Sequence, residues 1–282
     1  MKLEAPRAGR RVPEEWSAVA IVGVGLIGGS FALALRATGF AGRIIGVSSP
    51  DAVRVAIERG IIDSALPLAE AAAMAELIYL ARPIEGILSL LDEIDSFVAP
   101  GTLITDAGST KSAICARAIK KIHRGRFVGG HPMAGKEARG ASEAEASLFR
   151  GRPYVLTSRC DELERLVASF GARVEIISAE EHDVLVAFTS HLPQLISTAL
   201  AAAIGTEPEA GRVAGPAAMD LTRLALSPYE IWRDIFATNS ANIDGALGVF
   251  IGKLEGLRAE LRGSRIEPEF EDAAAAARAL RK

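Results

Sequence analysis

The chain has 282 residues, of which 49% are hydrophobic, and its formal net charge at pH 7 is -3. This length and apolar content are sufficient for two domains with buried cores. Because basic and acidic residues are interspersed and nearly balanced, the sequence lacks the basic surface with which proteins bind nucleic acids or anionic membranes.

The N-terminal segment, residues 1–17, contains three arginines and two prolines but no apolar stretch of the kind found in signal peptides. We interpret it as a flexible tail. The later alanine- and leucine-rich stretches are interrupted by charged residues, glycine or proline before the roughly 20 apolar residues that cross a bilayer. The sequence therefore predicts a cytoplasmic protein with no membrane partner. Cys115 and Cys160 show neither CxxC nor metal-ligand spacing, so we expect free thiols and no metal site.

Short apolar runs alternate with helical stretches between Ala18 and Ser178. We predict strands at Val19–Val22, Arg43–Val47, Leu77–Ala81, Thr102–Asp106, Arg126–Gly129, Tyr154–Thr157 and Val174–Ile177. Strands that alternate with helices are typical of a parallel sheet with crossover helices. The fold class predicted for residues 18–178 is therefore α/β, with a doubly wound parallel sheet.

A glycine-rich turn, Gly23-Val24-Gly25-Leu26-Ile27-Gly28, joins the first predicted strand to the helical segment 31–37. Strand, GxGxxG turn and helix occur in the order of a Rossmann dinucleotide-binding site. The first glycine permits the tight turn, the second lets a pyrophosphate approach the backbone, and the third lets helix and strand pack closely. We predict that Gly23, Gly25, Leu26, Ile27 and Gly28 bind NAD or NADP at the helix N-terminus; a plain tight turn is the alternative.

The end of the second predicted strand carries Ser48 and Ser49, where an NAD-binding site often has an acid for the adenosine 2′-hydroxyl. Both hydroxyls could donate to a 2′-phosphate, whereas Asp51 would oppose one and the nearest cation, Arg54, lies on the following helix. The sequence therefore leaves the choice between NAD and NADP open. Pro83, at the end of the third predicted strand, is also expected beside the cofactor.

Two motifs at the ends of the next predicted strands carry the candidate chemistry. Asp106-Ala107-Gly108-Ser109-Thr110-Lys111 follows one strand and opens a helix, which places Ser109 where it can contact nicotinamide or substrate or, alternatively, cap that helix. His131 follows the next strand within Gly129-Gly130-His131-Pro132-Met133-Ala134-Gly135. A histidine in such a loop can accept a proton at neutral pH, and we predict that His131 is a catalytic base.

Beyond Ser178 the pattern becomes helical to the C-terminus. Ser178 and Glu181 have the spacing of a capping box, and helices are broken near Gly205, Gly215, Pro228 and Gly263. Several of these helices are apolar on more than one face, so they need partners beyond the sheet domain. We predict an all-α domain over residues 179–282 that forms a homodimer; a monomeric helical domain packed on itself is the alternative.

Together these segments resemble the prephenate dehydrogenase family, including its members that use arogenate. The matching segments are the glycine turn, Asp106–Lys111, Gly130–Gly135, Ser190–Pro193, and Thr222–Arg223 with Trp232–Asp234. The resemblance implies a Rossmann domain, a helical dimerisation domain, and a reaction of tyrosine biosynthesis. In that reaction prephenate is converted to 4-hydroxyphenylpyruvate and carbon dioxide while NAD(P) is reduced.

The resemblance also implies roles for individual residues. His131 would hydrogen-bond the substrate hydroxyl and act as the base, and Ser109 would orient His131 and the nicotinamide. Arg223 would bind a substrate carboxylate with two hydrogen bonds, and His191 would line the same pocket. Trp232 would reach the substrate site of the partner subunit, although a tryptophan on an apolar helix is more often part of a core.

One position departs from the family pattern: Lys136-Glu137 follows Gly135, where the family often has Thr-Glu. We expect both residues at the substrate, with Lys136 either contacting a carboxylate or pairing with Glu137. A cation there would favour prephenate, and an acid facing an ammonium group would favour arogenate.

Three other functions stay open. Arogenate dehydrogenase is the nearest alternative. A dinucleotide-binding regulatory dimer without catalysis is a second, and intact Ser109, His131, His191 and Arg223 argue against it. A hydroxyacid or imine reductase is a third. It predicts a catalytic Lys or Asp on the first long helix after Ser178, where this chain has His191 and Pro193 instead.

Overall fold

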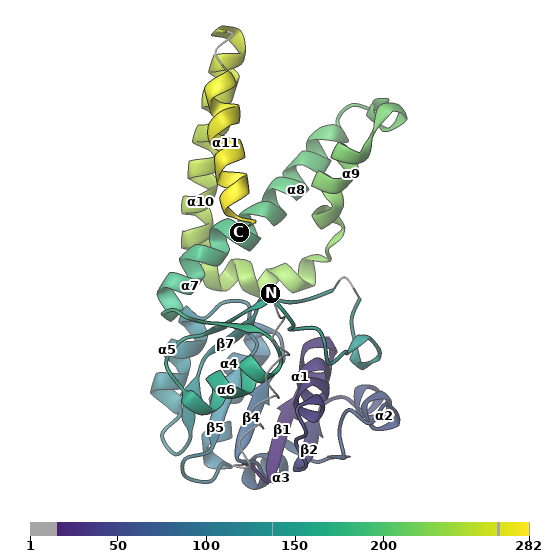
Figure 1. Ribbon diagram of the computed structural model, residues 1–282, viewed down its shortest axis with the longest axis vertical. Helices are drawn as coiled ribbons and strands as arrows, with labels where there is room; N and C mark the ends of the chain where they lie inside the picture. The colour runs from purple at the N-terminus through teal and green to yellow at the C-terminus, as the bar shows by residue number, and fades with distance from the viewer. Residues whose placement is uncertain (1–15, 137, 264–265, 282) are drawn as a thin grey trace, which may run out of the picture. The chain divides into compact units, whose positions relative to one another are not determined.

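The computed structural model describes residues 16–136, 138–263 and 266–281 (Figure 1). Two compact units can be separated. The first comprises the chain up to Val186 together with Ser227–Thr238, and the second comprises Ala187–Leu226 together with the chain from Asn239 onward. We describe each unit by itself. The predicted division at residue 178 stays a prediction.

A six-stranded parallel sheet forms the centre of the first unit in the described part of the chain, with strand order β3-β2-β1-β4-β5-β6. Its strands are β1 (Ala18–Val22), β2 (Arg43–Val47), β3 (Ser64–Ala65), β4 (Leu77–Leu80), β5 (Leu103–Asp106) and β6 (Arg126–Val128). β1, β4 and β5 are buried along their whole length, as expected for parallel strands covered on both faces. The order reverses at β1, which confirms the predicted Rossmann-type sheet.

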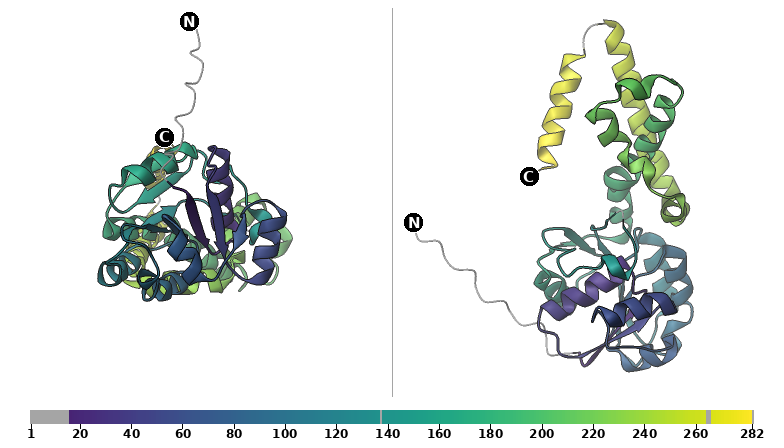
Figure 2. Two further views of the ribbon diagram at one scale, coloured as in Figure 1. Left: turned by 90° about the horizontal axis from the view of Figure 1, so that it is seen from below. Right: turned by 90° about the vertical axis from the view of Figure 1, so that its right-hand side faces the viewer.

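Helices cover both faces of this sheet (Figures 1 and 2). They are α1 (Leu26–Ala37), α2 (Pro50–Glu58), α3 (Leu68–Met74), α4 (Ile84–Leu91), α5 (Ser112–Lys121) and α6 (Asp161–Ser169). Phe31 of α1 packs in one apolar cluster, and Ile87 of α4 and Ile114 of α5 pack in a second cluster on the opposite face. Burial of these two clusters is the main driving force for folding of the unit.

The last two predicted strands do not join the six-stranded sheet, which corrects the prediction of a single sheet. They form a separate three-stranded sheet of β7 (Gly130–Pro132), β8 (Pro153–Leu156) and β9 (Arg173–Ile176), in which β7 runs antiparallel to β8 and β8 parallel to β9. The apolar runs indicate strands but carry no information on which strands pair. β7 and the two-residue β3 are too short to give a periodic signal.

The helix after Ser178, α7 (Ala179–Val186), begins as predicted. The Ser178 hydroxyl accepts a hydrogen bond from the backbone N–H of Glu181 at 3.1 Å. A π-helical turn, Ala187–His191, follows α7 and leads into α8 (Leu192–Ile204). Pro193 lacks the N–H that an α-helix would use at this point, which explains the irregular turn.

The second unit is helical. It contains α8, α9 (Pro216–Thr222), the part of α10 (Tyr229–Gly263) from Asn239 onward, and α11 (Glu267–Ala279). α10 has non-helical backbone angles at Asn239. α10 and α11 form an antiparallel pair, drawn in yellow-green and yellow in the right-hand view of Figure 2. The predicted helix breaks at Gly205 and Gly215 coincide with helix ends.

The helical run Ala179–Ile204 is, by length and composition, apolar enough to cross a membrane, contrary to the sequence expectation. It is the only such run within the described residues. Histidine, serine and proline interrupt the run without lowering its hydropathy enough to exclude it. The run also buries His182, Asp183, Gln194 and Ser197.

Candidate active site

The glycine turn connects β1 to α1 in a conformation that only glycine permits at two positions. Gly23 has a φ of +100°, and a Cβ there would lie 2.2 Å from the carbonyl oxygen of Ala81. A Cβ on Gly28 would lie 2.1 Å from the carbonyl oxygen of Gly23. These two glycines therefore set the close packing of the turn against β4 and α1.

Gly25 differs from its neighbours because a Cβ there would meet no described atom within 4 Å. It is the N-cap of α1, and no described side chain caps this helix. The turn thus presents an open, unobstructed helix N-terminus, which matches the space and the N–H donors that a dinucleotide pyrophosphate requires. The chain's own residues fit a nucleotide cofactor here.

A cavity of about 480 Å³ extends from this turn along the carboxyl edge of the sheet. Five of the predicted cofactor residues line it, and so does the predicted substrate residue Lys136. The lining residues used below are Gly25, Leu26, Ile27, Pro83, Ser109 and Lys136. Arg82 and Arg139 add two cations to the same wall, and Glu230 and Asp234 add two acids. The cavity therefore offers both charge signs to a ligand.

Ser48 and Ser49 are exposed at the start of α2 and do not line this cavity. Ser49 is the N-cap of α2, and Pro50 is its first residue. Arg54 pairs with Glu58 on the same helix at 3.1 Å, with both side chains more than 60% exposed. The choice between NAD and NADP therefore stays open at this strand end.

Asp106 and Lys111 hold the two chemical motifs together. Their side chains form a fully buried ion pair. Asp106 also accepts hydrogen bonds from the backbone N–H of Gly108 at 2.7 Å and of Gly130 at 3.0 Å. The Ser109 loop and the residue before His131 are thus fixed to one carboxylate.

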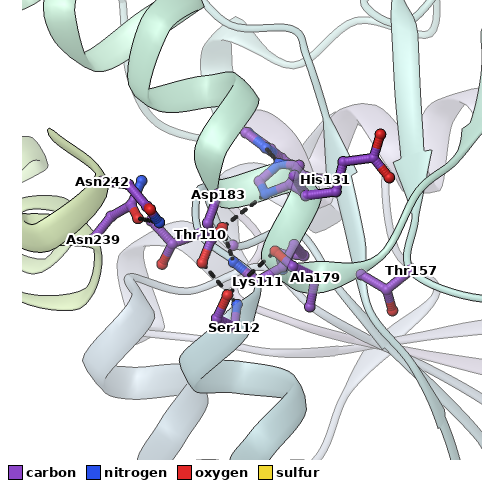
Figure 3. A network of polar contacts seen from close by, with 12 residues as sticks. Thr110, Lys111, Ser112, His131, Thr157, Ala179, Asp183, Asn239 and Asn242 are labelled. Atoms are coloured by element: carbon purple, nitrogen blue, oxygen red, sulfur yellow. Dashed lines mark hydrogen bonds and ion pairs between the residues drawn. The ribbon is translucent and has the colours of Figure 1, made fainter. Parts of the chain in front are cut away.

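The Ser109 loop does not cap α5 with the Ser109 side chain; Lys111 is the N-cap residue. Asp183 of α7 fills this role instead, since it accepts hydrogen bonds from the backbone N–H of Lys111 at 2.7 Å and of Ser112 at 2.8 Å. Figure 3 shows Asp183 pointing at the first residues of α5. The cap interpretation of Ser109 is therefore wrong, and Ser109 is left to line the cavity.

His131 lies within β7 rather than in a loop after a strand, and it pairs with Val155 of β8. It is half-buried. Its Nδ1 lies 2.8 Å from Nε2 of His182, whose Nδ1 lies 2.8 Å from Oδ1 of Asp183. His131 is not among the residues that line the cavity, but Ala134 and Gly135 three and four residues later are.

His191 and Arg223 belong to the second unit. His191 ends the π-helical turn, and the side-chain nitrogen of Asn239 lies 3.2 Å from its Nδ1. The oxygen of Asn239 accepts from Asn242 at 2.8 Å, which fixes the amide so that its nitrogen faces His191. Arg223 is exposed at the start of a short 3-10 turn.

Trp232 belongs to the first unit, where its ring stacks on Phe236 with a centroid distance of 5.8 Å. Its indole N–H donates to the Ser227 hydroxyl at 2.9 Å. These contacts fit the core role that was the alternative in the sequence. Lys136 forms an ion pair with Glu145 at 2.8 Å. Glu137 lies outside the described residues.

Sequence reasoning missed His182, Asp183, Arg139 and Glu230. The adjacent His182-Asp183 pair in the first turns of the helix after Ser178 is the signal that could have identified two of them. That helix thus has a buried Asp, although its carboxylate is used to cap α5. Within the described ranges, no group of three or more His, Cys, Asp or Glu side chains could hold a metal ion.

Two family models match consecutive parts of the chain. Residues 31–176 match "Prephenate dehydrogenase, nucleotide-binding domain", and residues 178–273 match "Prephenate dehydrogenase, dimerization domain". Among curated relatives, prephenate dehydrogenase of Lactococcus lactis is 36% identical over 78% of this chain and 64% of the relative. That of Bacillus subtilis is 32% identical over 85% of this chain and 69% of the relative. The chain thus spans about two thirds of the length of these relatives.

Solved structures agree with these matches. Prephenate dehydrogenase from Aquifex aeolicus, in complex with hydroxyphenyl propionate and NAD+, has a TM-score of 0.86 at 29% identity and covers 94% of this chain and 98% of its own. Synechocystis arogenate dehydrogenase has a TM-score of 0.80, also at 29% identity, with the same coverage of both chains.

Proposed function

The chain belongs to the prephenate dehydrogenase family, and we propose that it catalyses the oxidative decarboxylation of prephenate with NAD(P)+. The products are 4-hydroxyphenylpyruvate, carbon dioxide and reduced cofactor, and the reaction is a step of tyrosine biosynthesis. The observation that carries the proposal is the joint anchoring of the Ser109 loop and the His131 strand by Asp106, at the end of the sheet where the glycine turn opens.

Gly25, Leu26 and Ile27 would hold the pyrophosphate of the cofactor at the N-terminus of α1, with Pro83 and Ser109 further along the same cavity. When bound, the nicotinamide supplies the hydride acceptor. His131 takes up the proton of the substrate hydroxyl as the ring carbon bearing it loses hydride. Loss of the ring carboxylate as carbon dioxide leaves an aromatic ring, which makes the reaction irreversible.

Prephenate is a dianion, so its binding requires cations or N–H donors. We assign this role to Arg223 and His191, as the family resemblance implies, because a guanidinium binds a carboxylate through two hydrogen bonds. Lys136, which lines the cavity, is a further cation, although its ion pair with Glu145 must be exchanged for a substrate contact. Glu137 is assigned to the same substrate site, and Trp232 to the substrate site of the partner subunit, as the family resemblance implies.

Oxidation of arogenate is the second candidate activity. Its ammonium group would need an acid, and Glu230 at the wall of the cavity supplies one. The likeness to Synechocystis arogenate dehydrogenase supports the same alternative.

We further propose that the protein is a cytoplasmic homodimer formed through its helical unit. The dimerization model that matches residues 178–273 supports this assembly. So do the large apolar side chains that are exposed on the helices of the second unit: Met219, Leu221, Leu226, Val249, Ile251, Leu254 and Phe270. Light scattering coupled to size exclusion tests it; a single monomer mass across concentrations overturns it.

The activity is tested by incubating purified protein with prephenate or arogenate and with NAD+ or NADP+, following the absorbance of reduced nicotinamide and identifying the product. Turnover of prephenate to 4-hydroxyphenylpyruvate supports the proposal. Turnover of arogenate alone reassigns the substrate, and the absence of turnover in all four mixtures overturns the enzyme assignment.

A further inference from the structure

Two side chains, His182 and Asp183, lie in a row behind the proposed base His131. Nδ1 of His131 is 2.8 Å from Nε2 of His182, and the two rings meet edge to face with centroids 5.0 Å apart. Nδ1 of His182 is 2.8 Å from Oδ1 of Asp183. His182 is fully buried and Asp183 is 1% exposed. The row therefore runs from the strand that carries His131 into the protein interior.

The inner end of the row is a carboxylate. Burial by itself raises the pKa of Asp183, but hydrogen bonds from His182, from the backbone N–H of Lys111 and from Ser112 outweigh it, so the pKa is below its usual value. The N-terminus of α5 adds a favourable helix dipole. Asp183 is therefore ionised at neutral pH and can only accept hydrogen bonds.

The carboxylate determines where each proton of the row lies. Because Asp183 accepts, Nδ1 of His182 must be the donor, and neutral His182 then has a lone pair on Nε2. Nδ1 of His131 must donate to that lone pair. Neutral His131 consequently carries its proton on Nδ1 and its basic lone pair on Nε2, so the row selects one of the two tautomers.

We propose that His182 and Asp183 are positioning residues that hold His131 as the Nδ1–H tautomer, with Nε2 as the atom that takes the substrate proton. This inference rests on the proposed function only for the role of Nε2. The tautomer itself follows from the row with His182 neutral and does not depend on the reaction.

The same row stabilises the product of proton transfer. After Nε2 has taken the proton, His131 is a cation that still donates a hydrogen bond from Nδ1 to His182. The negative charge of Asp183, on the far side of the His182 ring, balances this positive charge. The other charged groups of the neighbouring β5–α5 segment, Asp106 and Lys111, neutralise each other in their ion pair. On β8 the nearby titratable group is Tyr154, which hydrogen-bonds Tyr79. Asp183 is thus the carboxylate to which His131 is linked through His182.

The first test does not use activity. The chain has four histidines, so a nitrogen NMR spectrum of histidine-labelled protein resolves each ring, and single His→Gln variants assign them. We expect His131 to be protonated on Nδ1 and His182 also on Nδ1. A His131 ring protonated on Nε2 in the wild-type protein overturns the inference, whether or not the protein turns over prephenate.

The second test uses the pH profile of turnover. His182→Leu should lower kcat by about 100-fold, the lower end of the range for general acid–base catalysis, and should move the base-dependent limb of the kcat profile to a lower pH. KM for the cofactor should stay unchanged. His182→Gln, whose Oε1 can accept from His131 Nδ1, should recover part of kcat. His123→Leu, at an exposed histidine, is the matched control and should behave as wild type.

The outcomes separate the two claims. If wild-type protein oxidises neither prephenate nor arogenate, the proposed function fails, and the NMR spectrum still decides on the row. If wild-type protein turns over but His182→Leu, shown by NMR to be folded, keeps the wild-type kcat and pH profile, the positioning role is overturned while the activity stands. If His182→Leu does not fold, His182→Gln is used in its place. The positioning role is overturned if His131 is protonated on Nε2 in His182→Gln and the pH profile of kcat is still that of the wild-type protein.

Discussion

Asp106 and Lys111 form an ion pair in which neither side chain is exposed to solvent, at the junction of β5 and α5. The Asp106 carboxylate also accepts from the backbone of Gly108 and Gly130. A Cβ on Gly130 would lie 2.7 Å from the Asp106 carbonyl oxygen, so the two chain segments are in close contact there. This pair therefore fixes the geometry of the Ser109 loop relative to the His131 strand.

Removing one charge of this pair should strongly destabilise the protein. Asp106→Asn leaves the Lys111 ammonium buried without its counter-ion, and we expect the free energy of unfolding to fall by about 3–5 kcal/mol. Urea unfolding measures the change. The control is Asp92→Asn, at an exposed ion pair with Arg117 and Lys121, for which we expect a much smaller loss because surface ion pairs are screened by solvent. Equal losses in both variants would contradict the anchoring role.

The glycine turn should separate cofactor binding from folding. Gly25→Ala adds a methyl group to open space, so the fold should be retained, while the methyl group obstructs the pyrophosphate. We expect KM for the cofactor to rise about tenfold or more, equivalent to about 1.4 kcal/mol of binding free energy. The thermal unfolding temperature should stay close to that of wild type.

Gly28→Ala is the matched comparison, because its Cβ would lie 2.1 Å from the Gly23 carbonyl oxygen. This variant should lose about 1–3 kcal/mol of stability through overpacking. If Gly25→Ala binds the cofactor like wild type, the turn does not hold the pyrophosphate.

The pair of buried tyrosines should make the protein sensitive to high pH. The Tyr154 hydroxyl donates to the Tyr79 hydroxyl at 3.2 Å. Burial raises the pKa of Tyr79 well above its usual value, with the charge of Tyr154 adding to the effect, and burial also raises the pKa of Tyr154. Both phenols therefore stay protonated in the folded state at a pH where the unfolded chain, with a tyrosine pKa of about 10, has released the protons.

Proton linkage gives the direction in which the free energy of unfolding changes with pH. Stability is fully present below about pH 10 and falls as the pH rises further, by up to about 1.4 kcal/mol per pH unit for each tyrosine. Urea unfolding at a series of pH values should show this fall. It should be smaller in Tyr79→Phe/Tyr154→Phe, in which both partners of the hydrogen bond are removed together. The same pH slope in both proteins would contradict the linkage.

What could be predicted from the sequence depended on how far apart the interacting residues lie along the chain. The glycine turn and the Ser178 cap of α7 are local, so their spacing alone predicted them. The contact of His131 with His182 joins residues 51 positions apart. The Asp106–Gly130 contact joins residues 24 positions apart. Hydrophobic periodicity carries no information on contacts between residues so far apart along the chain. The position of Ser109 after the end of β5 was predicted, whereas the placement of His131 inside β7 and the network behind it were not.

The same limit applies to the second sheet. Apolar runs at β8 and β9 predicted strands in the right places, but β7 has only three residues and one of them is a proline. The antiparallel pairing of β7 with β8 is what places His131 opposite Val155 and next to α7. The sequence-based assignment of His131 to a loop therefore missed the element that fixes the ring.

The most direct test of the account is the rate of prephenate oxidation by the wild-type protein and by His131→Asn, measured with saturating cofactor and with KM for the cofactor determined for both. Loss of the base should reduce kcat by about 100- to 10,000-fold while KM for the cofactor, whose proposed site is the Gly25 turn, changes little. A His131→Asn protein that oxidises prephenate at the wild-type rate would contradict the assignment of His131 as the base.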